Sequence, residues 1–450
     1  MKRILFVYPN QGTELRIPLA ISILISAIRK AGHIVKLFDT TFMGDFHTDN
    51  EAMEKLGTHL KTDLNVKGNK LVPLDELNKV IKDFKPDFIC ASLVERNFKT
   101  CKELLKDIDI PILIGGILPT IAPSFVLQED WVDYICVGEG EEPVIDFLAH
   151  PDESVPNIWT INDYPYLRSL ISLNDVPFQD WSDFDERHLL KPFMGKVYKG
   201  GAFEFSRGCG KSCTFCVAPQ IRKTMAGCGK YHRTKAPQIA IGEIEQKVNQ
   251  YGLNMISFGD TDFLQGVPKR DMIRFLQMYE ERIGLPFTMQ ASVETLTDPV
   301  ILEMLHTAHC CAISVGVESG SDRIRKSVIK KAIPIEIFNK AFDLCRRYNL
   351  RVTANYMVGL PYETEKDVLD TIKLNRLLNP PSIAVTFFTP FMGTELYDVC
   401  IKEDFYQPFQ ENVYEYPPLR MPQLSQERIV GLVKEFSDDF KSYQRDFNVC

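Results

Sequence analysis

Residues 201–219 read GAFEFSRGCGKSCTFCVAP, an apolar strand pattern that runs directly into a loop with three cysteines. These are Cys209, Cys213 and Cys216, and they lie among Gly, Lys, Ser and Thr rather than inside a core strand. Thiols at this spacing can form a disulfide, a zinc site, a redox pair or part of an iron–sulfur cluster. The surrounding chain has to distinguish these sites.

The same strand opens a series of six strand–helix repeats over residues 199–390. Right-handed crossovers between parallel strands should bend this series into a partial (β/α)6 barrel of the TIM type. An eight-fold barrel would need about two more repeats, which the tail does not supply. The functional loops of such barrels follow the carboxyl ends of the strands, as the cysteine loop does. Strands are expected at GAFEFS, NMISFGD, PFTMQAS, CAISVGV, RVTANYMVG and SIAVTFF.

The segments outside the barrel have three different patterns. Residues 1–150 alternate helices with the apolar strands KRILFVYP, HIVKLFDT, PDFICASL, PILIGG and DYICVGEG, which predicts an α/β, doubly wound, Rossmann-like parallel sheet. Residues 151–198 are rich in Pro, Asp and aromatic residues and should form a linker packed against a domain. Residues 391–450 end in a helical pattern and are expected to cap the mouth of the barrel.

The composition argues against several classes of protein. The 450 residues are 45% hydrophobic, as in ordinary globular proteins, and their net charge of −8 argues against broad nucleic-acid binding. The first apolar run is too short for a signal peptide or a membrane span. Twelve cysteines without a secretion signal indicate free thiols in a reducing compartment. We therefore expect a cytoplasmic protein with no membrane or nucleic-acid partner.

Two metal sites compete for the cysteine loop. A structural zinc ion needs four ligands, and Cys228 or His232 could supply the fourth. Three thiolates can instead hold three corners of a [4Fe–4S] cube and leave one iron open for a ligand that is not protein. Phe215 could pack beside that ligand, and Gly208 and Gly210 allow the loop to bend around a cluster. The cluster explains more of the loop than zinc does.

The loop resembles the CxxxCxxC signature of the radical S-adenosylmethionine (SAM) enzymes, through CGKSCTFC after the first barrel strand. Three further strand ends resemble the SAM-binding segments of that family: FGDTDF (258–263), VGVESGS (315–321) and NYMVGLPYET (355–364). The resemblance implies a [4Fe–4S] cluster on Cys209, Cys213 and Cys216. It implies SAM contacts by Phe215, Gly259, Asp260, Glu318, Ser319, Met357 and Gly359.

Each SAM segment also has a purely structural interpretation. GLPYET could form only a strand-to-helix turn, because Pro fixes φ and an acidic residue suits a helix start. Asp260 and Asp262 could cap a turn, and Ser319 or Ser321 could cap a helix. Their shared position at the carboxyl ends of barrel strands favours ligand binding.

The loops of the first domain resemble those of the cobalamin-binding domain that precedes the barrel in one radical SAM subfamily. SLVERN, GGILPT and VGEGEE carry this resemblance, whereas the dinucleotide fingerprint GxGxxG is missing, so NAD or FAD binding is unexpected. The implied corrin contacts are Ser92, Gly115, Gly116, Gly138, Glu139 and Gly140. A domain that keeps the fold without binding the corrin is the alternative.

The resemblance also bears on the coordination of cobalt. Other cobalamin proteins supply an axial histidine through a DxHxxG motif, but FDTTFMG has Thr41 where the histidine would stand, between Asp39 and Gly44. The resemblance therefore implies cobalamin bound base-off, without a histidine ligand. A cobalt without a strong lower ligand suits transfer of a methyl group to a radical.

The family chemistry implies reductive cleavage of SAM, with one electron from a donor such as flavodoxin or ferredoxin, and hydrogen abstraction by a 5′-deoxyadenosyl radical. The favoured function is methylation of an unactivated carbon in a small-molecule or natural-product substrate. The alternatives are a radical SAM cyclase or ring-rearranging enzyme without methyl transfer, and a zinc-stabilised corrin-binding protein without catalysis. The substrate cavity is expected to include Tyr356, Gln290 and Arg207.

Methylthiotransferases fit the sequence poorly. They need a second set of cysteines in the N-terminal domain, and Cys90, Cys101 and Cys136 do not resemble one. They also carry a basic RNA-binding module at the C-terminus, where this chain is mixed in charge.

Overall fold

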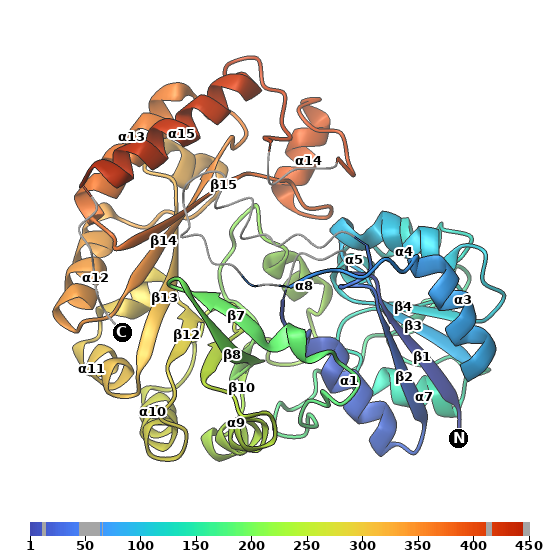
Figure 1. Ribbon diagram of the computed structural model, residues 1–450. Helices are drawn as coiled ribbons and strands as arrows, with labels where there is room; N and C mark the ends of the chain where they lie inside the picture. The colour runs from blue at the N-terminus through green and yellow to red at the C-terminus, as the bar shows by residue number, and fades with distance from the viewer. Residues whose placement is uncertain (11–14, 45–63, 65, 411–415, 444–450) are drawn as a thin grey trace. The chain divides into compact units, whose positions relative to one another are not determined.

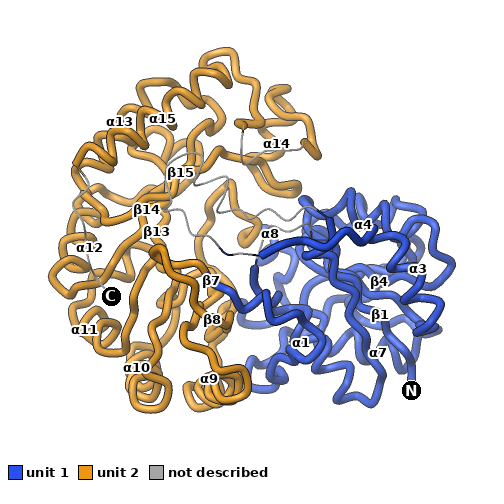
Figure 2. Tube along the Cα trace, in the orientation of Figure 1, with its two compact units in different colours: residues 1–48, 64–191, 220–231 blue, residues 49–63, 192–219, 232–450 orange. Residues whose placement is uncertain are grey.

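A computed structural model describes residues 1–10, 15–44, 64, 66–410 and 416–443 (Figure 1). The chain forms two compact units, coloured separately in Figure 2. Of the described residues, unit 1 contains those within 1–48, 64–191 and 220–231, and unit 2 contains those within 192–219 and 232–450. Most of the expected linker thus packs with unit 1, and so does a short segment that begins soon after the cysteine loop.

Unit 1 is built on a sheet with the strand order β2-β1-β3-β4-β5-β6. The first five strands are parallel, and β6, which the sequence did not predict, adds antiparallel to β5. The order 2-1-3-4-5 is doubly wound, with its switch point between β1 and β3, and therefore confirms the predicted fold. The strands are β1 (Arg3–Tyr8), β2 (Ile34–Asp39), β3 (Phe88–Ser92), β4 (Ile112–Gly115), β5 (Tyr134–Cys136) and β6 (Ile158–Trp159).

Two sets of helices pack on this sheet. Helix α1 (Leu19–Lys30) contacts α7 (Pro143–Ala149), while α3 (Pro73–Phe84) contacts α4 (Phe98–Leu105). Most of α1 is buried because its sequence, LAISILISAIRK, is apolar on nearly every side. The connections also include the short elements η1 (Glu95–Asn97), α5 (Ile117–Ile121), α6 (Pro123–Leu127) and η2 (Glu186–Leu189).

Unit 2 has a seven-stranded sheet in the order β15-β14-β13-β12-β11-β8-β7. Each pair from β8 to β15 is parallel, so six strands form the predicted partial barrel. The first strand ends at Phe203 rather than Ser206, because Ser206 and Arg207 pair with a separate strand. The strands are β7 (Leu190–Phe193), β8 (Lys196–Phe203), β9 (Ser206–Arg207), β10 (Arg233–Thr234), β11 (Met255–Phe258), β12 (Phe287–Gln290), β13 (Cys310–Glu318), β14 (Val352–Val358) and β15 (Ser382–Phe387).

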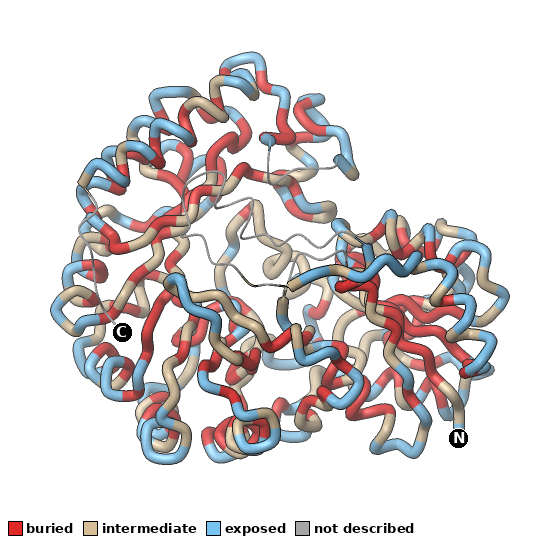
Figure 3. Tube along the Cα trace, in the orientation of Figure 1, coloured by how far each residue is buried: buried red, intermediate tan, exposed pale blue. Residues whose placement is uncertain are grey.

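Helices form an outer layer around the barrel sheet (Figure 1). The strands beneath them are largely buried (Figure 3), and a cluster of aromatic rings around Phe258 fills part of the core. Among the described residues, no helix is both long and apolar enough to cross a bilayer. The helices are α8 (Ala218–Thr224), α9 (Pro237–Tyr251), α10 (Lys269–Arg282), η3 (Val293–Thr297), α11 (Pro299–Thr307), η4 (Ile324–Val328), α12 (Ile335–Arg347), α13 (Glu365–Leu378), α14 (Glu395–Lys402) and α15 (Gln426–Tyr443).

One expected helix takes another form. The sequence SDRIRKSVIKK after β13 predicts a helix, but the structure has a short π-helix, η4, at this position. Arg325 within it is fully buried, and its guanidinium donates a hydrogen bond of 2.8 Å to the carbonyl of Ser319. This side-chain contact with the end of β13 accompanies the departure from α-helical geometry.

Candidate functional site

The three cysteines of the 209–216 loop are free thiols that follow the carboxyl end of β8. Cys209 is buried, whereas Cys213 and Cys216 are half-buried. Burial raises the pKa of Cys213 to about 11, since the charge of nearby Lys331 lowers it only in part. Two of the sulfurs accept hydrogen bonds from the backbone. The N–H of Lys211 donates to Sγ of Cys209 at 3.4 Å, and the N–H of Ala218 donates to Sγ of Cys216 at 3.5 Å. The loop therefore presents sulfur ligands that a metal would have to deprotonate.

The grouping of the described side chains does not decide between zinc and a cluster. No three His, Cys, Asp or Glu side chains among them are arranged to hold a single metal ion. Cys228 belongs to unit 1, where its thiol lies 3.7 Å from the carbonyl of Leu167. The spacing of the three cysteines in the sequence, rather than their geometry, favours a cluster with one open iron.

Two residues that the sequence did not single out hold this loop in place. The N–H of Gly210 donates to the side-chain carbonyl of Gln265 at 2.8 Å. Lys211 forms an ion pair with Glu294, which follows β12 at the same edge of the barrel. Both contacts join residues more than 50 positions apart, so no local motif reveals them.

Asp260 fastens the start of the cysteine loop to the end of β11. It is 2% exposed, and it accepts hydrogen bonds from the N–H of Phe205 at 3.1 Å and from the hydroxyl of Ser206 at 2.6 Å. Burial raises its pKa to about 6. Gly259 is exposed and donates its N–H to the carbonyl of Phe203 at 2.7 Å. The SAM contacts of Asp260 and Gly259 stay predictions, and the structure gives Asp260 a supporting role.

Glu318 forms a buried ion pair with Lys331, at 3.0 Å, at the end of β13. Burial lowers the pKa of Lys331, but the adjacent Glu318 raises it more. Lys331 also donates to the carbonyl of Gly316 at 2.6 Å, and Glu318 has a left-handed backbone with φ of 70°. A left-handed glutamate that bears a buried charge is the kind of strained position that clusters at ligand sites. Sequence reasoning identified Glu318 but missed Lys331.

The other expected SAM residues of the barrel have mixed environments. Ser319 is fully buried, and its hydroxyl lies 3.3 Å from that of Thr371. Phe215 and Met357 are half-buried beside the predicted site segments. The expectation that Tyr356 lines the cavity is wrong, because side chains alternate along β14. Its hydroxyl donates to Asn375 of α13 at 3.0 Å, on the helix side of the sheet.

The GLPYET segment forms the strand-to-helix turn that one interpretation predicted, and Glu363 closes it. Gly359 and Leu360 donate their N–H groups to one carboxylate oxygen of Glu363, at 2.6 and 3.2 Å. The other oxygen is buried without a hydrogen-bond partner among the described residues, and burial raises the pKa of Glu363 to about 8. Gly359 has φ of 87°, so the turn needs a glycine there. Its contact with SAM stays a prediction.

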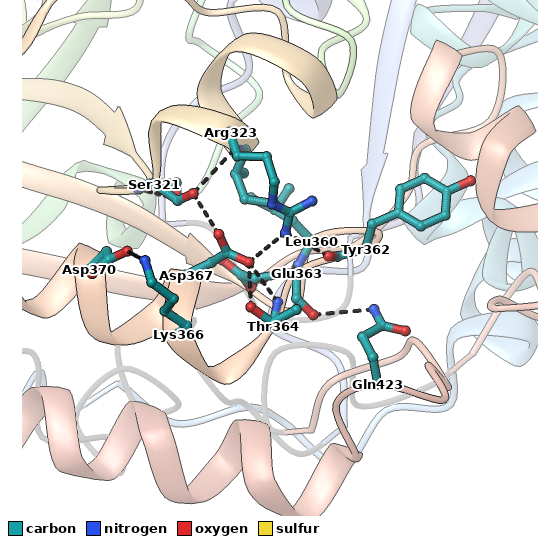
Figure 4. Close-up of polar contacts among 12 residues, drawn as sticks. Ser321, Arg323, Leu360, Tyr362, Glu363, Thr364, Lys366, Asp367, Asp370 and Gln423 are labelled. Atoms are coloured by element: carbon teal, nitrogen blue, oxygen red, sulfur yellow. Dashed lines mark hydrogen bonds and ion pairs between the residues drawn. The ribbon is translucent and has the colours of Figure 1, made fainter.

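A second carboxylate in this turn has the opposite environment (Figure 4). Asp367 accepts hydrogen bonds from the hydroxyls of Ser321 and Thr364, both at 2.6 Å, and pairs with Arg323 at 2.5 Å. Burial alone would raise its pKa, but these bonds hold the pKa of Asp367 well below its usual range. Ser321 therefore connects the VGVESGS segment to α13, and its hydroxyl also accepts the N–H of Ile324 at 3.4 Å, as the capping interpretation predicts.

The glycines predicted to contact the corrin are explained largely by the packing of unit 1 itself. A Cβ on Gly116, whose φ is 107°, would lie 2.8 Å from the carbonyl oxygen of Leu93. A Cβ on Gly138 would lie 2.7 Å from the sulfur of Met225, which belongs to the 220–231 segment. Both glycines have a positive φ and close neighbours in unit 1, so the fold favours glycine at each position whether or not a ligand is present, and their contacts with a corrin stay predictions.

The remaining corrin candidates have looser surroundings. A Cβ on Gly140 would lie 3.3 Å from a side-chain carbon of Leu24, whereas a Cβ on Gly115 would meet nothing nearer than 3.9 Å. Ser92 is half-buried at the end of β3. Glu139 lines a small pocket in unit 1, together with Asn157, Arg168 and Met225.

Two exposed apolar residues mark the carboxyl edge of the unit 1 sheet. Val94 follows β3 and is 37% exposed, and Ile117 follows β4 and is 40% exposed. The hydrogen bond from the N–H of Leu118 to the carbonyl of Leu93 joins the two loops. Ligands of doubly wound sheets bind at this edge, so an apolar surface there fits a large organic ring such as a corrin.

A histidine of the linker, His188, contacts the FDTTFMG segment. Nε2 of His188 lies 2.6 Å from a carboxylate oxygen of Asp39, and the hydroxyl of Thr41 donates to the other oxygen. His188 is 1% exposed and packs edge-on against Phe42. The contact fastens the linker to the end of β2, and the base-off state of cobalt stays a prediction.

Comparisons with known proteins match two parts of the chain. Residues 203–374 match the family model described as the radical SAM superfamily, and residues 16–148 match the B12 binding domain. The cytidylyl-2-hydroxyethylphosphonate methyltransferase of Streptomyces wedmorensis is 22% identical over 94% of this chain and 86% of that protein. The anaerobic magnesium-protoporphyrin IX monomethyl ester cyclase of Rubrivivax gelatinosus is 23% identical over 72% of this chain and 60% of that protein.

Two solved structures share the fold. The methyltransferase TsrM of Kitasatospora setae, with cobalamin and a [4Fe–4S] cluster bound, has a TM-score of 0.66 at 16% identity, covering 98% of this chain and 81% of that one. The cobalamin-dependent enzyme OxsB has a TM-score of 0.62 at 18% identity, covering 90% and 56%. The chain thus joins a B12-binding domain to a radical SAM domain, as its motifs predict.

Proposed function

We propose that the chain is a cobalamin-dependent radical SAM enzyme that methylates an unactivated carbon of a small-molecule substrate. The observation that carries the proposal is the position of the three free thiols, which follow the first barrel strand in a chain that also holds a B12-binding domain. The buried pair of Glu318 and Lys331 at the end of β13 supports it, because its charges complement a zwitterionic amino acid group.

The residues of unit 2 divide the tasks of the site. Cys209, Cys213 and Cys216 would hold the [4Fe–4S] cluster. Lys331 would donate to the carboxylate of SAM, and Glu318 would accept hydrogen bonds from its hydroxyl or ammonium groups. When bound, the cluster and cobalamin supply the electron that cleaves SAM and the methyl group that is transferred.

Other side chains would bind and shield the same ligands. Phe215, half-buried beside Cys216, and Met357 on β14 would cover apolar parts of SAM and exclude water. In unit 1, Val94 and Ile117 would contact the face of the corrin ring. An electron donor such as flavodoxin or ferredoxin would supply the reducing equivalent.

Methyl transfer is favoured over cyclisation by the coverage of the relatives. The phosphonate methyltransferase aligns with 94% of this chain and 86% of its own length. The cyclase of Rubrivivax gelatinosus aligns with only 60% of its length. A cyclase without methyl transfer is the second candidate, because the cyclase of Rubrivivax gelatinosus, at 23% identity, is about as similar in sequence as the methyltransferase, at 22%.

The test uses the full chain, reconstituted anaerobically with iron and sulfide and incubated with SAM, cobalamin and a reductant. We expect 5′-deoxyadenosine together with S-adenosylhomocysteine, and neither product from the Cys213→Ala variant. Deoxyadenosine without S-adenosylhomocysteine would favour the cyclase. A reconstituted protein that holds iron but leaves SAM intact would contradict both candidates.

A further inference from the structure

Thr214 stands between two cysteines of the loop and is fixed from three directions. It is 3% exposed. Its hydroxyl donates to the carbonyl of Val328 at 2.7 Å, and its N–H donates to the carbonyl of Ile329 at 3.3 Å. Its own carbonyl accepts the N–H of Leu396 at 3.1 Å. All three bonds lie within unit 2 and join residues far apart in the sequence.

The partners of Thr214 belong to two different segments. Val328 and Ile329 end η4 and lead directly to Lys331, the partner of Glu318. Leu396 lies in the first turn of α14, and the preceding residue, Glu395, pairs with Lys330 at 2.5 Å. The cysteine loop, the segment that delivers Lys331 and the start of α14 therefore meet at one buried residue, through its hydroxyl and its backbone.

We infer that Thr214 is a positioning residue, which sets the sulfurs of Cys213 and Cys216 relative to Lys331 and holds α14 against the cysteine loop. The inference rests on the proposed function, because it assigns a [4Fe–4S] cluster to these thiols. Cys213 and Cys216 are only half-buried, so their placement depends on the residue between them. Residues behind metal ligands orient those ligands, and their loss weakens metal binding by about 10- to 100-fold.

The inference gives the C-terminal region a structural role besides the expected one of covering the barrel mouth. The same region contacts the GLPYET turn, where Gln423 donates to the carbonyl of Glu363 at 3.2 Å. Residues after β15 thus support two of the segments predicted to bind cofactors. This makes α14 part of the scaffold of the cysteine loop.

The test compares Thr214→Val, Thr214→Ser and a matched control. Valine keeps the shape of threonine but removes the hydroxyl donor, whereas serine keeps the donor. Thr40→Val is the control, because Thr40 is also buried and donates to a backbone carbonyl, that of Asn10 at 2.8 Å, in unit 1. The readouts are the rate of iron loss to a chelator from the reconstituted protein and the EPR spectrum of its reduced cluster.

We expect Thr214→Val to lose iron about 10-fold faster than the wild type or more, with an altered EPR spectrum. Thr214→Ser and Thr40→Val should behave like the wild type. Equal rates in all four proteins would overturn the inference, and so would loss from the serine variant as fast as from the valine variant. If circular dichroism shows that the valine variant does not fold, Thr214→Ala replaces it, because alanine removes the hydroxyl without adding bulk. Its rate of iron loss is then compared with that of the wild type in the same way. A wild type that assembles no cluster would overturn the proposed function as well, whereas a cluster indifferent to position 214 overturns this inference alone.

Discussion

The carboxyl edges of the two parallel sheets prepare for ligands in different ways. In unit 2 the edge carries chemical groups: three thiols and the buried charges of Glu318 and Lys331. In unit 1 the edge is formed by close packing and apolar surface: Gly116 lies against the backbone of Leu93, and the side chains of Val94 and Ile117 are exposed. A ligand bound by specific side chains requires a sequence motif that can be recognised. A ligand bound by a surface requires only small and apolar residues, which many sequences contain.

The largest effect expected from this difference is that of Cys213→Ala. Removal of one of three sulfur ligands should abolish the cluster, seen as loss of the broad brown absorbance after anaerobic reconstitution. Cobalamin binding, measured by co-elution of the corrin with the protein, should persist because no predicted corrin contact lies in the cysteine loop. Loss of the corrin together with the cluster would show that the two edges do not act separately.

The next effect concerns the buried charges of unit 2. Lys331→Met leaves Glu318 as an unpaired buried carboxylate, and breaking such a pair costs about 3–5 kcal/mol of stability. The double variant Lys331→Met, Glu318→Gln should recover much of that loss, because it removes the uncompensated charge. Urea unfolding of the cofactor-free proteins measures both values. A single variant as stable as the wild type would mean that the pair is solvated rather than buried.

The sequence predicts what is local and misses what is distant. Alternating apolar runs identify the parallel strands of both units, and the spacing of Cys209, Cys213 and Cys216 identifies the loop, because each signal lies within a few residues. Lys331 pairs with Glu318 across an irregular π-helical connection, which no periodic pattern predicts. His188 meets Asp39 from 149 positions away, so only the folded chain reveals that contact.

The glycines show a second limit of sequence reasoning. GGILPT and VGEGEE resemble corrin-binding loops, but sequence alone does not say whether a glycine makes room for a ligand or for the protein. The structure separates the two cases: Gly116 and Gly138 face their own chain at under 3 Å, and Gly115 does not. Likewise, Asp260 belongs to a motif that implies SAM binding, yet its contacts are with Phe205 and Ser206, which lead into the cysteine loop.

The third prediction tests this division within unit 1. Gly116→Ala should destabilise the fold by about 3 kcal/mol, because a left-handed alanine is strained and its Cβ meets backbone atoms that cannot move aside. Gly115→Ala has room for its Cβ and should change the free energy of unfolding little, so any loss of cobalamin affinity in this variant reports on the ligand. If both alanine variants unfold at the same urea concentration, packing does not explain Gly116.

The smallest effect is a pH dependence that separates two carboxylates of the barrel edge. The pKa of Glu363 rises from 4.5 to about 8 on folding, so between these values the folded state holds a proton that the unfolded state has lost. Stability should therefore fall as pH rises, by up to about 1.4 kcal/mol per unit and about 2 kcal/mol between pH 6 and 8. Asp367 has a lowered pKa and loses its contribution only in acid, while Asp260, with a pKa of about 6, adds a smaller fall that is largely complete by pH 7. Glu363→Gln should remove the fall in the free energy of unfolding between pH 7 and 8, measured by urea unfolding, and exposed Glu365→Gln should keep it. A fall that survives in Glu363→Gln would assign the titration to another group and leave Glu363 ionised in the folded chain.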